Sequence, residues 1–96
     1  MLDELGRMPD EIADSLRARG IKGVRNTVRI LNPIVRYALA QLAGVQSADL
    51  ILADRLRIEF ASGETTEVPV PSAVREFLAM FHRGEYPDLE MPTGPG

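Results

Sequence analysis

The sequence predicts an α+β fold with two or three N-terminal helices, a small antiparallel sheet of two or three strands, and one C-terminal amphipathic helix. Three observations lead to this prediction. Apolar residues recur at helical spacing in the first half of the 96-residue chain. Between residues 46 and 70 they alternate with polar residues, and after residue 72 the helical spacing returns. The length favours one domain, at residues 1–90, with a flexible tail at residues 91–96.

The first helix is expected over residues 9–19. Pro9 suits a first helical position, and the acidic residues that follow it lie where the helix dipole favours anions. Gly20 is suited to end the helix in the left-handed conformation. The stripe expected to be buried comprises Ile12, Leu16, Met8 and Ala13.

Further helices are expected before the sheet. Residues 24–31 favour a helix, although their apolar spacing fits an extended stretch about as well. Asn32 is a good N-cap and Pro33 suits the first position of a helix over residues 33–43, which Gly44 ends. This helix should be largely buried because its apolar stripe is broad.

The strand pattern predicts a hairpin whose register keeps one face apolar. A three- or five-residue turn containing Gly63 achieves this, and it sets Glu59 opposite Glu67. Pro69 cannot donate a ladder hydrogen bond, so the second strand is expected to lie at an edge or to end there. A further strand at residues 49–52 would complete a meander. The predicted pairs are Ile58 with Val68, Leu56 with Val70, and Phe60 with Thr66.

The last helix is expected from residue 72 or 73 to residue 83. Ser72 is a fitting N-cap after Pro71. We expect the apolar face of this helix to pack on the sheet, and residues 86–89 to fold back onto the core. That face consists of Val74, Phe77, Leu78 and Phe81.

Charge is sorted along the chain. Residues 15–48 contain no acidic residue and carry +6, whereas residues 1–14 carry −4 and residues 49–96 carry −5. Such segregation bears on partner choice and on self-association. The basic residues are Arg17, Arg19, Lys22, Arg25, Arg29 and Arg36.

Composition argues against an enzyme. The chain has no cysteine, and its one histidine, His82, has no neighbouring catalytic motif. Neither a metal-ligand spacing nor a cofactor motif is recognisable. No apolar run reaches the roughly 18–20 residues that cross a bilayer, so the sequence favours a cytoplasmic protein without a membrane partner.

These observations favour a non-enzymatic protein-binding or adaptor module that presents its basic face to an acidic surface of a partner protein. The basic residues could instead pair with the acidic ends of the chain's own fold. A homodimer formed by strand pairing around Val68 also stays open, although Pro69 limits its length.

DNA binding is the main alternative function. A helix at the start of the chain, a glycine turn and a basic helix over residues 24–31 resemble a helix-turn-helix, with the hairpin as a wing. Arg25, Asn26 and Arg29 would then enter the major groove. The net charge of −3 and the acidic hairpin tip at Glu64 argue against this alternative.

Three landmarks span most of residues 10–89. They are a Gly-Ile-Lys-Gly turn at residues 20–23, a Pro-led helix with Pro33 and Tyr37, and a C-terminal stretch with Pro71, Ala73, Val74, Phe77, Gly84, Tyr86, Pro87 and Leu89. In these landmarks the chain resembles a group of short uncharacterised actinobacterial proteins. The resemblance implies a shared small fold and no particular activity. Asn32 stands where that group often has Cys, so any redox or metal role of that Cys would be missing here.

Overall fold

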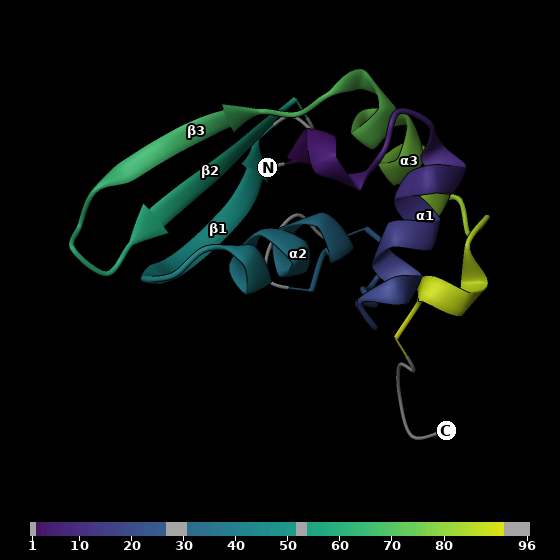
Figure 1. Ribbon diagram of the computed structural model, residues 1–96, viewed down its shortest axis with the longest axis horizontal. Helices are drawn as coiled ribbons and strands as arrows, with labels where there is room; N and C mark the ends of the chain where they lie inside the picture. Colours follow the sequence, from purple (N-terminus) through teal and green to yellow (C-terminus); the bar gives the residue numbers. More distant parts are fainter. Residues whose placement is uncertain (1, 27–30, 52–53, 92–96) are drawn as a thin grey trace.

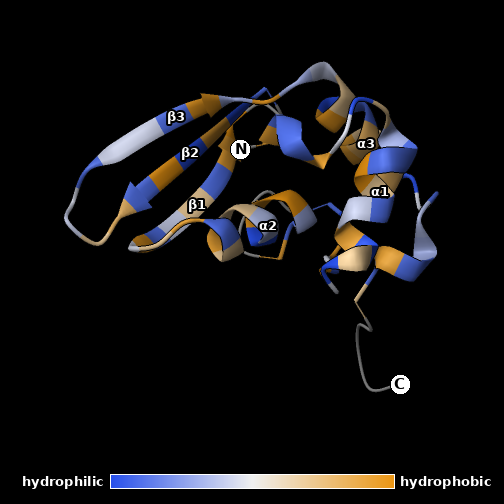
Figure 2. Cartoon of the chain, viewed as in Figure 1, coloured by the Kyte–Doolittle hydropathy of each residue, from blue (hydrophilic) through white to orange (hydrophobic). Residues whose placement is uncertain are grey.

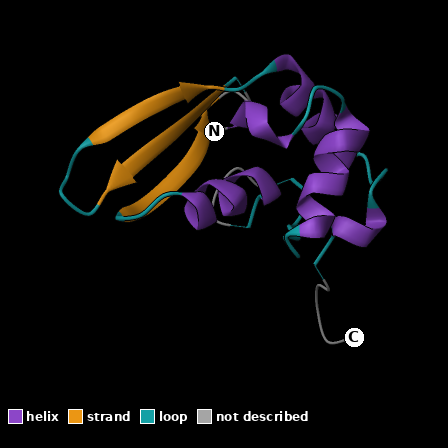
Figure 3. Cartoon of the chain, viewed as in Figure 1, coloured by secondary structure: helices purple, strands orange, loops and turns teal. Residues whose placement is uncertain are grey.

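The α+β prediction is confirmed by a computed structural model, which describes residues 2–26, 31–51 and 54–91 (Figures 1 and 3). The three α-helices and three β-strands of this described part are accompanied by two short 3₁₀ helices, η1 and η2. In chain order the elements are η1 (Leu2–Leu5), α1 (Pro9–Ala18), α2 (Pro33–Gln41), β1 (Val45–Ile51), β2 (Arg55–Phe60), β3 (Thr65–Pro69), α3 (Ser72–His82) and η2 (Pro87–Leu89).

Helices α1 and α3 lie at one end of the sheet, α2 lies alongside β1, and the tip of the β2–β3 hairpin points away from α1 and α3 (Figure 1). Helix α2 packs against β1, whereas α3 packs chiefly against α1. The expectation that α3 covers the sheet is therefore corrected, although its predicted apolar face is buried. After β3 the chain enters α3, which lies beside α1. The apolar stripe of α1, centred on Ile12 and Leu16, packs against the apolar face of α3. Figure 2 shows where hydrophobic residues recur along these helices, and the apolar stripes of α1 and α3 are buried.

The sheet has the order β1-β2-β3, and its two pairings are antiparallel. The predicted alternation is correct for Leu56 and Ile58 of β2, which are buried, but Thr66 of β3 is exposed. The register also differs from the predicted one by two residues. Leu56 pairs with Val68, and Glu67 lies opposite Arg57 instead of Glu59. Glu67 also forms an ion pair with Arg55, with 3.1 Å between Nη1 and Oε1. The predicted repulsion between two glutamates is thus replaced by attraction.

A three-residue loop at residues 61–63 sets this register. The N–H of Gly63 donates to the carbonyl of Phe60 at 2.9 Å, and the N–H of Phe60 donates to the carbonyl of Glu64 at 2.8 Å. Gly63 has φ +94°, a conformation that favours glycine. Of the three- and five-residue turns predicted around Gly63, the three-residue turn is present, and β3 is the expected edge strand ending at Pro69.

Most helix ends agree with their predicted signals. Gly20 follows α1 with φ +67°, and the Asn32 side chain accepts a hydrogen bond from the N–H of Ile34 at 2.9 Å. Two details were wrong. Met8 is 61% exposed and lies outside the buried stripe, and Ser72 is the first residue of α3, whose N-cap is Pro71.

The helix expected over residues 24–31 is contradicted at its start, while residues 27–30 lie outside the described residues. Asn26 has φ +62°, which an α-helix does not accommodate. The N–H of Val24 donates instead to the carbonyl of Leu31 at 2.7 Å.

The C-terminal segment folds back onto the core, as predicted. Tyr86 and Leu89 are buried. Gly23 donates its N–H to the carbonyl of Leu89 at 2.9 Å and accepts a bond from the N–H of Met91 at 2.8 Å. Met91, placed in the flexible tail by the sequence, is therefore attached to the fold, and residues 92–96 lie outside the described part.

Candidate functional site

Arg17 is bound to the chain's own carboxylates. Its Nη1 lies 2.7 Å from Asp14 Oδ1, its Nη2 lies 3.2 Å from Asp88 Oδ1, and its Nε also donates to Asp88. The Arg17 hydrogen bond holds the pKa of Asp88 below its usual range. The guanidinium carbon also lies 6.0 Å from the centre of the Tyr86 ring. Arg17 therefore joins α1 to η2 and offers little charge to a partner.

Arg25 is neutralised in the same way. Its Nε lies 3.0 Å from Glu90 Oε1. The guanidinium also covers Gly84, where a Cβ atom would lie only 2.9 Å from Nη1 of Arg25. The alternative in which the basic residues pair with the acidic ends of the fold is thus confirmed for Arg17 and Arg25.

Arg19, Lys22 and Arg36 form no ion pair with any carboxylate of the described residues. Arg19 donates to the carbonyl of Ser15 at 3.1 Å, and its guanidinium carbon lies 5.4 Å from the centre of the Tyr37 ring. Lys22 is exposed, and Arg36 is half-buried. Arg29 lies outside the described residues.

Two contacts link the segments that carry these three cations. Arg36 Nη1 lies 3.4 Å from the sulfur of Met91, whose N–H bonds to Gly23, the neighbour of Lys22. Arg19 covers Tyr37, the neighbour of Arg36. We call Arg19, Lys22 and Arg36 the basic face. It is smaller than the surface predicted from the sequence, because Arg17 and Arg25 are withdrawn from it.

The helix-turn-helix interpretation requires a second helix over residues 24–31, and the start of this segment is not helical. Asn26 has left-handed backbone geometry, and Arg25 is held by Glu90. Neither residue is presented on a helix that could enter a major groove.

His82 binds the backbone of the segment that follows Gly23. Its Nδ1 accepts a hydrogen bond from the backbone N–H of Asn26 at 2.9 Å. Burial lowers the pKa of His82, so the neutral ring that this bond requires is favoured. Within the described ranges, no carboxylate hydrogen-bonds to His82, and no group of three or more metal-ligating side chains occurs. None of the helices described combines the length and apolar character that a bilayer crossing needs.

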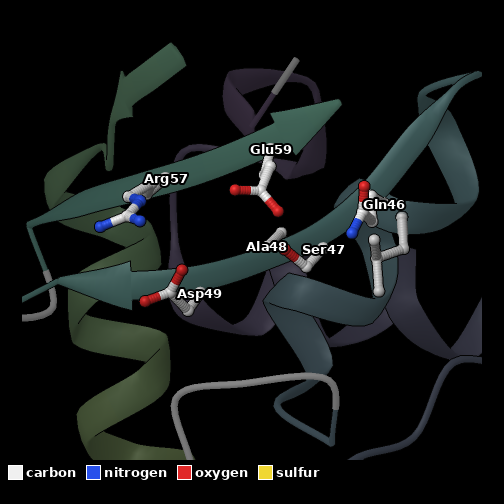
Figure 4. A pocket seen from close by; sticks show the side chains of 7 residues that line it. Gln46, Ser47, Ala48, Asp49, Arg57 and Glu59 are labelled. Carbon is white, nitrogen blue, oxygen red and sulfur yellow. The ribbon is translucent and has the colours of Figure 1, made fainter. Parts of the chain in front are cut away.

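An open groove on the outer face of the sheet was not singled out from the sequence (Figure 4). Arg57 on β2 has Asp49 on β1 and Glu67 on β3 as its cross-strand neighbours. The alternation of charged residues along β2 was the available signal, since it predicts an exposed charged face. A shallow polar groove can hydrogen-bond a partner but does not enclose a substrate. Its volume is about 440 Å³, and it is lined by Leu39, Gln46, Ser47, Ala48, Asp49, Arg57 and Glu59.

No protein-family model matches the chain, and comparisons with curated proteins and with solved structures find no match either. The resemblance to actinobacterial proteins therefore stays a prediction. Its landmarks nevertheless meet in space. Gly23 bonds to Leu89, and a Cβ atom on Gly23 would lie 2.4 Å from Cδ of Pro33. The landmark residues thus have a structural explanation that needs no activity.

Proposed function

We propose that the chain is a non-enzymatic protein-binding module that contacts an acidic surface of a partner protein through the basic face of Arg19, Lys22 and Arg36. The observation that supports this proposal is that Arg19, Lys22 and Arg36 lie on segments linked through Met91 and Tyr37, and that none of the three forms an ion pair in the described part of the chain. Arg17 and Arg25 belong to the fold's internal ion pairs and contribute little to the contact.

Exposed charges of this kind act mainly on the rate and specificity of association. Each exposed pair contributes about 0.2–1 kcal/mol and is weakened by salt. Arg19 is the best oriented of the three, because the Tyr37 ring and the Ser15 carbonyl restrict its side chain. An ordered guanidinium loses less conformational entropy when it binds a carboxylate.

The proposal is tested with poly-L-glutamate as a defined acidic polypeptide, by fluorescence anisotropy at low and moderate salt. The triple variant Arg19→Gln, Lys22→Gln, Arg36→Gln should bind roughly tenfold more weakly than the wild type. A matched control changes the same number of charges elsewhere, at Arg7, Arg57 and Arg75, and should bind nearly as the wild type does.

Equal losses in the two triple variants would show that only net charge matters, and would overturn the basic face as a site. Duplex DNA serves as the second probe in the same assay. Binding of DNA without binding of poly-L-glutamate would replace the proposal by the DNA-binding alternative. The affinity for DNA should then fall steeply with salt.

A further inference from the structure

The outer edge of β3 presents backbone groups that no described residue binds. Because Phe60 bonds to Glu64, the alternation of an antiparallel ladder makes Ile58 with Thr66 and Leu56 with Val68 the hydrogen-bonded pairs. Pro69, which has no N–H, accordingly lies in a pair that is not hydrogen-bonded. The N–H and C=O groups of Thr65 and Glu67 therefore point away from β2, towards solvent.

The two edges of the sheet differ in how they are covered. Helix α2 packs against β1, and Leu39 of α2 lines the same groove as Gln46 and Ser47 of β1. None of the helices in the described part of the chain runs alongside β3 (Figure 1), and Thr65, Thr66 and Glu67 are exposed. An uncovered edge of this kind is a template for pairing with another strand.

We infer that β3 pairs antiparallel with β3 of a second copy of this chain, about a two-fold axis that passes through Thr66. This register places Thr65 opposite Glu67 of the second copy, and the reverse, so that four backbone hydrogen bonds use all the open N–H and C=O groups of these two residues. Centring the pair on Glu67 would set Thr65 opposite Pro69, which has no N–H to donate. Centring it on Thr65 would use Gly63, whose N–H already bonds to Phe60.

The side chains are compatible with the same register. Thr66 faces Thr66 of the second copy, and Glu67 faces a threonine hydroxyl instead of a second carboxylate. Like charges are not placed opposite one another anywhere along β3. The pairing is short, and Glu64 meets Val68 at each end, so the dimer is a weak one that forms at high protein concentration. The proposed dimer uses a surface distant in sequence from the basic face. A test of the dimer is therefore independent of the proposed function.

Disulfide trapping tests the axis directly, because the chain has no cysteine of its own. In the proposed pair, the two residues at position 66 lie about 4.5 Å apart at Cα, within the range of about 4.4–6.8 Å that a disulfide spans. Thr66→Cys should therefore form a cross-linked dimer at least about tenfold faster than Ser62→Cys, a variant whose thiol lies in the exposed loop, far from the axis. Equal rates would overturn the proposal.

Sedimentation equilibrium provides a second measurement on the unmodified chain. The wild type should show a concentration-dependent increase in mass, and Thr66→Lys should abolish it by placing two cations across the axis. Ser62→Lys, with the same change of charge, should associate as the wild type does. Circular dichroism checks that both variants fold. A wild type that stays monomeric up to millimolar concentration, or a Thr66→Lys variant that still dimerises, contradicts the proposed pairing.

Discussion

Gly23 donates its backbone N–H to the carbonyl of Leu89 across 2.9 Å, so a turn in the first quarter of the sequence is fastened to the C-terminal segment. The same glycine packs against Pro33 at the start of α2. One residue thus joins three parts of the chain that are distant in sequence, and the first prediction concerns its missing side chain.

Gly23→Ala should destabilise the fold by about 2–3 kcal/mol, because the added Cβ meets backbone atoms that cannot easily move. It would lie 2.6 Å from N of Pro33 and 2.7 Å from the carbonyl oxygen of Leu31. Gly20→Ala is the matched control, since its Cβ has open space and only its φ of +67° is unfavourable, at about 1–2 kcal/mol. Urea denaturation measures both. A smaller loss for Gly23→Ala than for Gly20→Ala would contradict the tight packing.

Asn32→Ala should cost about 1–2 kcal/mol of unfolding free energy, because it removes the side-chain cap of α2. Asn32 Oδ1 accepts from the N–H of Ile34 at 2.9 Å in a fully buried position. Asn32→Ser keeps a capping oxygen and should recover most of the loss. Thermal denaturation of the three proteins checks this order, and equal melting temperatures for the Ala and Ser variants would exclude capping as the cause.

Tyr86→Phe should lower stability by about 1 kcal/mol, because the Tyr86 hydroxyl donates to Asp10 Oδ1 at 2.9 Å. Burial, aided by this hydrogen bond, raises the pKa of Tyr86 to about 12. The raised pKa means that this contribution to stability is complete below the ordinary pKa near 10 and is lost as pH rises from about 10 towards 12. Unfolding followed at pH 8 and pH 11 should show the wild type losing more stability than the variant.

Acidification should weaken the bond between His82 and Asn26. Burial lowers the pKa of His82 below its ordinary value of 6.5, so its contribution to stability is complete above pH 6.5 and declines as pH falls below it. His82→Asn keeps an acceptor near the position of Nδ1 but does not titrate between pH 5 and 7. The wild type should therefore lose more stability than His82→Asn over that interval, and parallel pH profiles would refute the assignment.

Local signals predicted the elements well because their causes are local. The apolar spacing around Phe77 and the cap at Asn32 depend on neighbours within one or two turns. The hairpin illustrates the limit: the alternation required an odd-numbered loop, but both three and five residues satisfied it. The backbone of Gly63 selected three, and this moved every predicted pair by two positions.

The candidate site was harder to predict because its charges are decided by long-range contacts. Arg17 meets Asp88, and Arg25 meets Glu90, across 71 and 65 positions of sequence. The spacing of residues along the sequence does not indicate such pairs. All six basic residues were therefore predicted to be available to a partner. Residues 24–26 were misassigned for the same reason, since the backbone N–H of Asn26 is bound by His82 of α3.

The binding of residues 86–91 to Gly23 and α1 also has a consequence for biosynthesis. The meander of β1, β2 and β3 can form from consecutive stretches as they leave the ribosome. The contacts around α1 and α3 are complete only once residues 86–91 have been made, because Tyr86 donates to Asp10 of α1 and its ring lies 5.2 Å from that of Phe77 of α3. Until residues 86–91 have been synthesised, the nascent chain keeps part of the apolar stripe of α1 exposed.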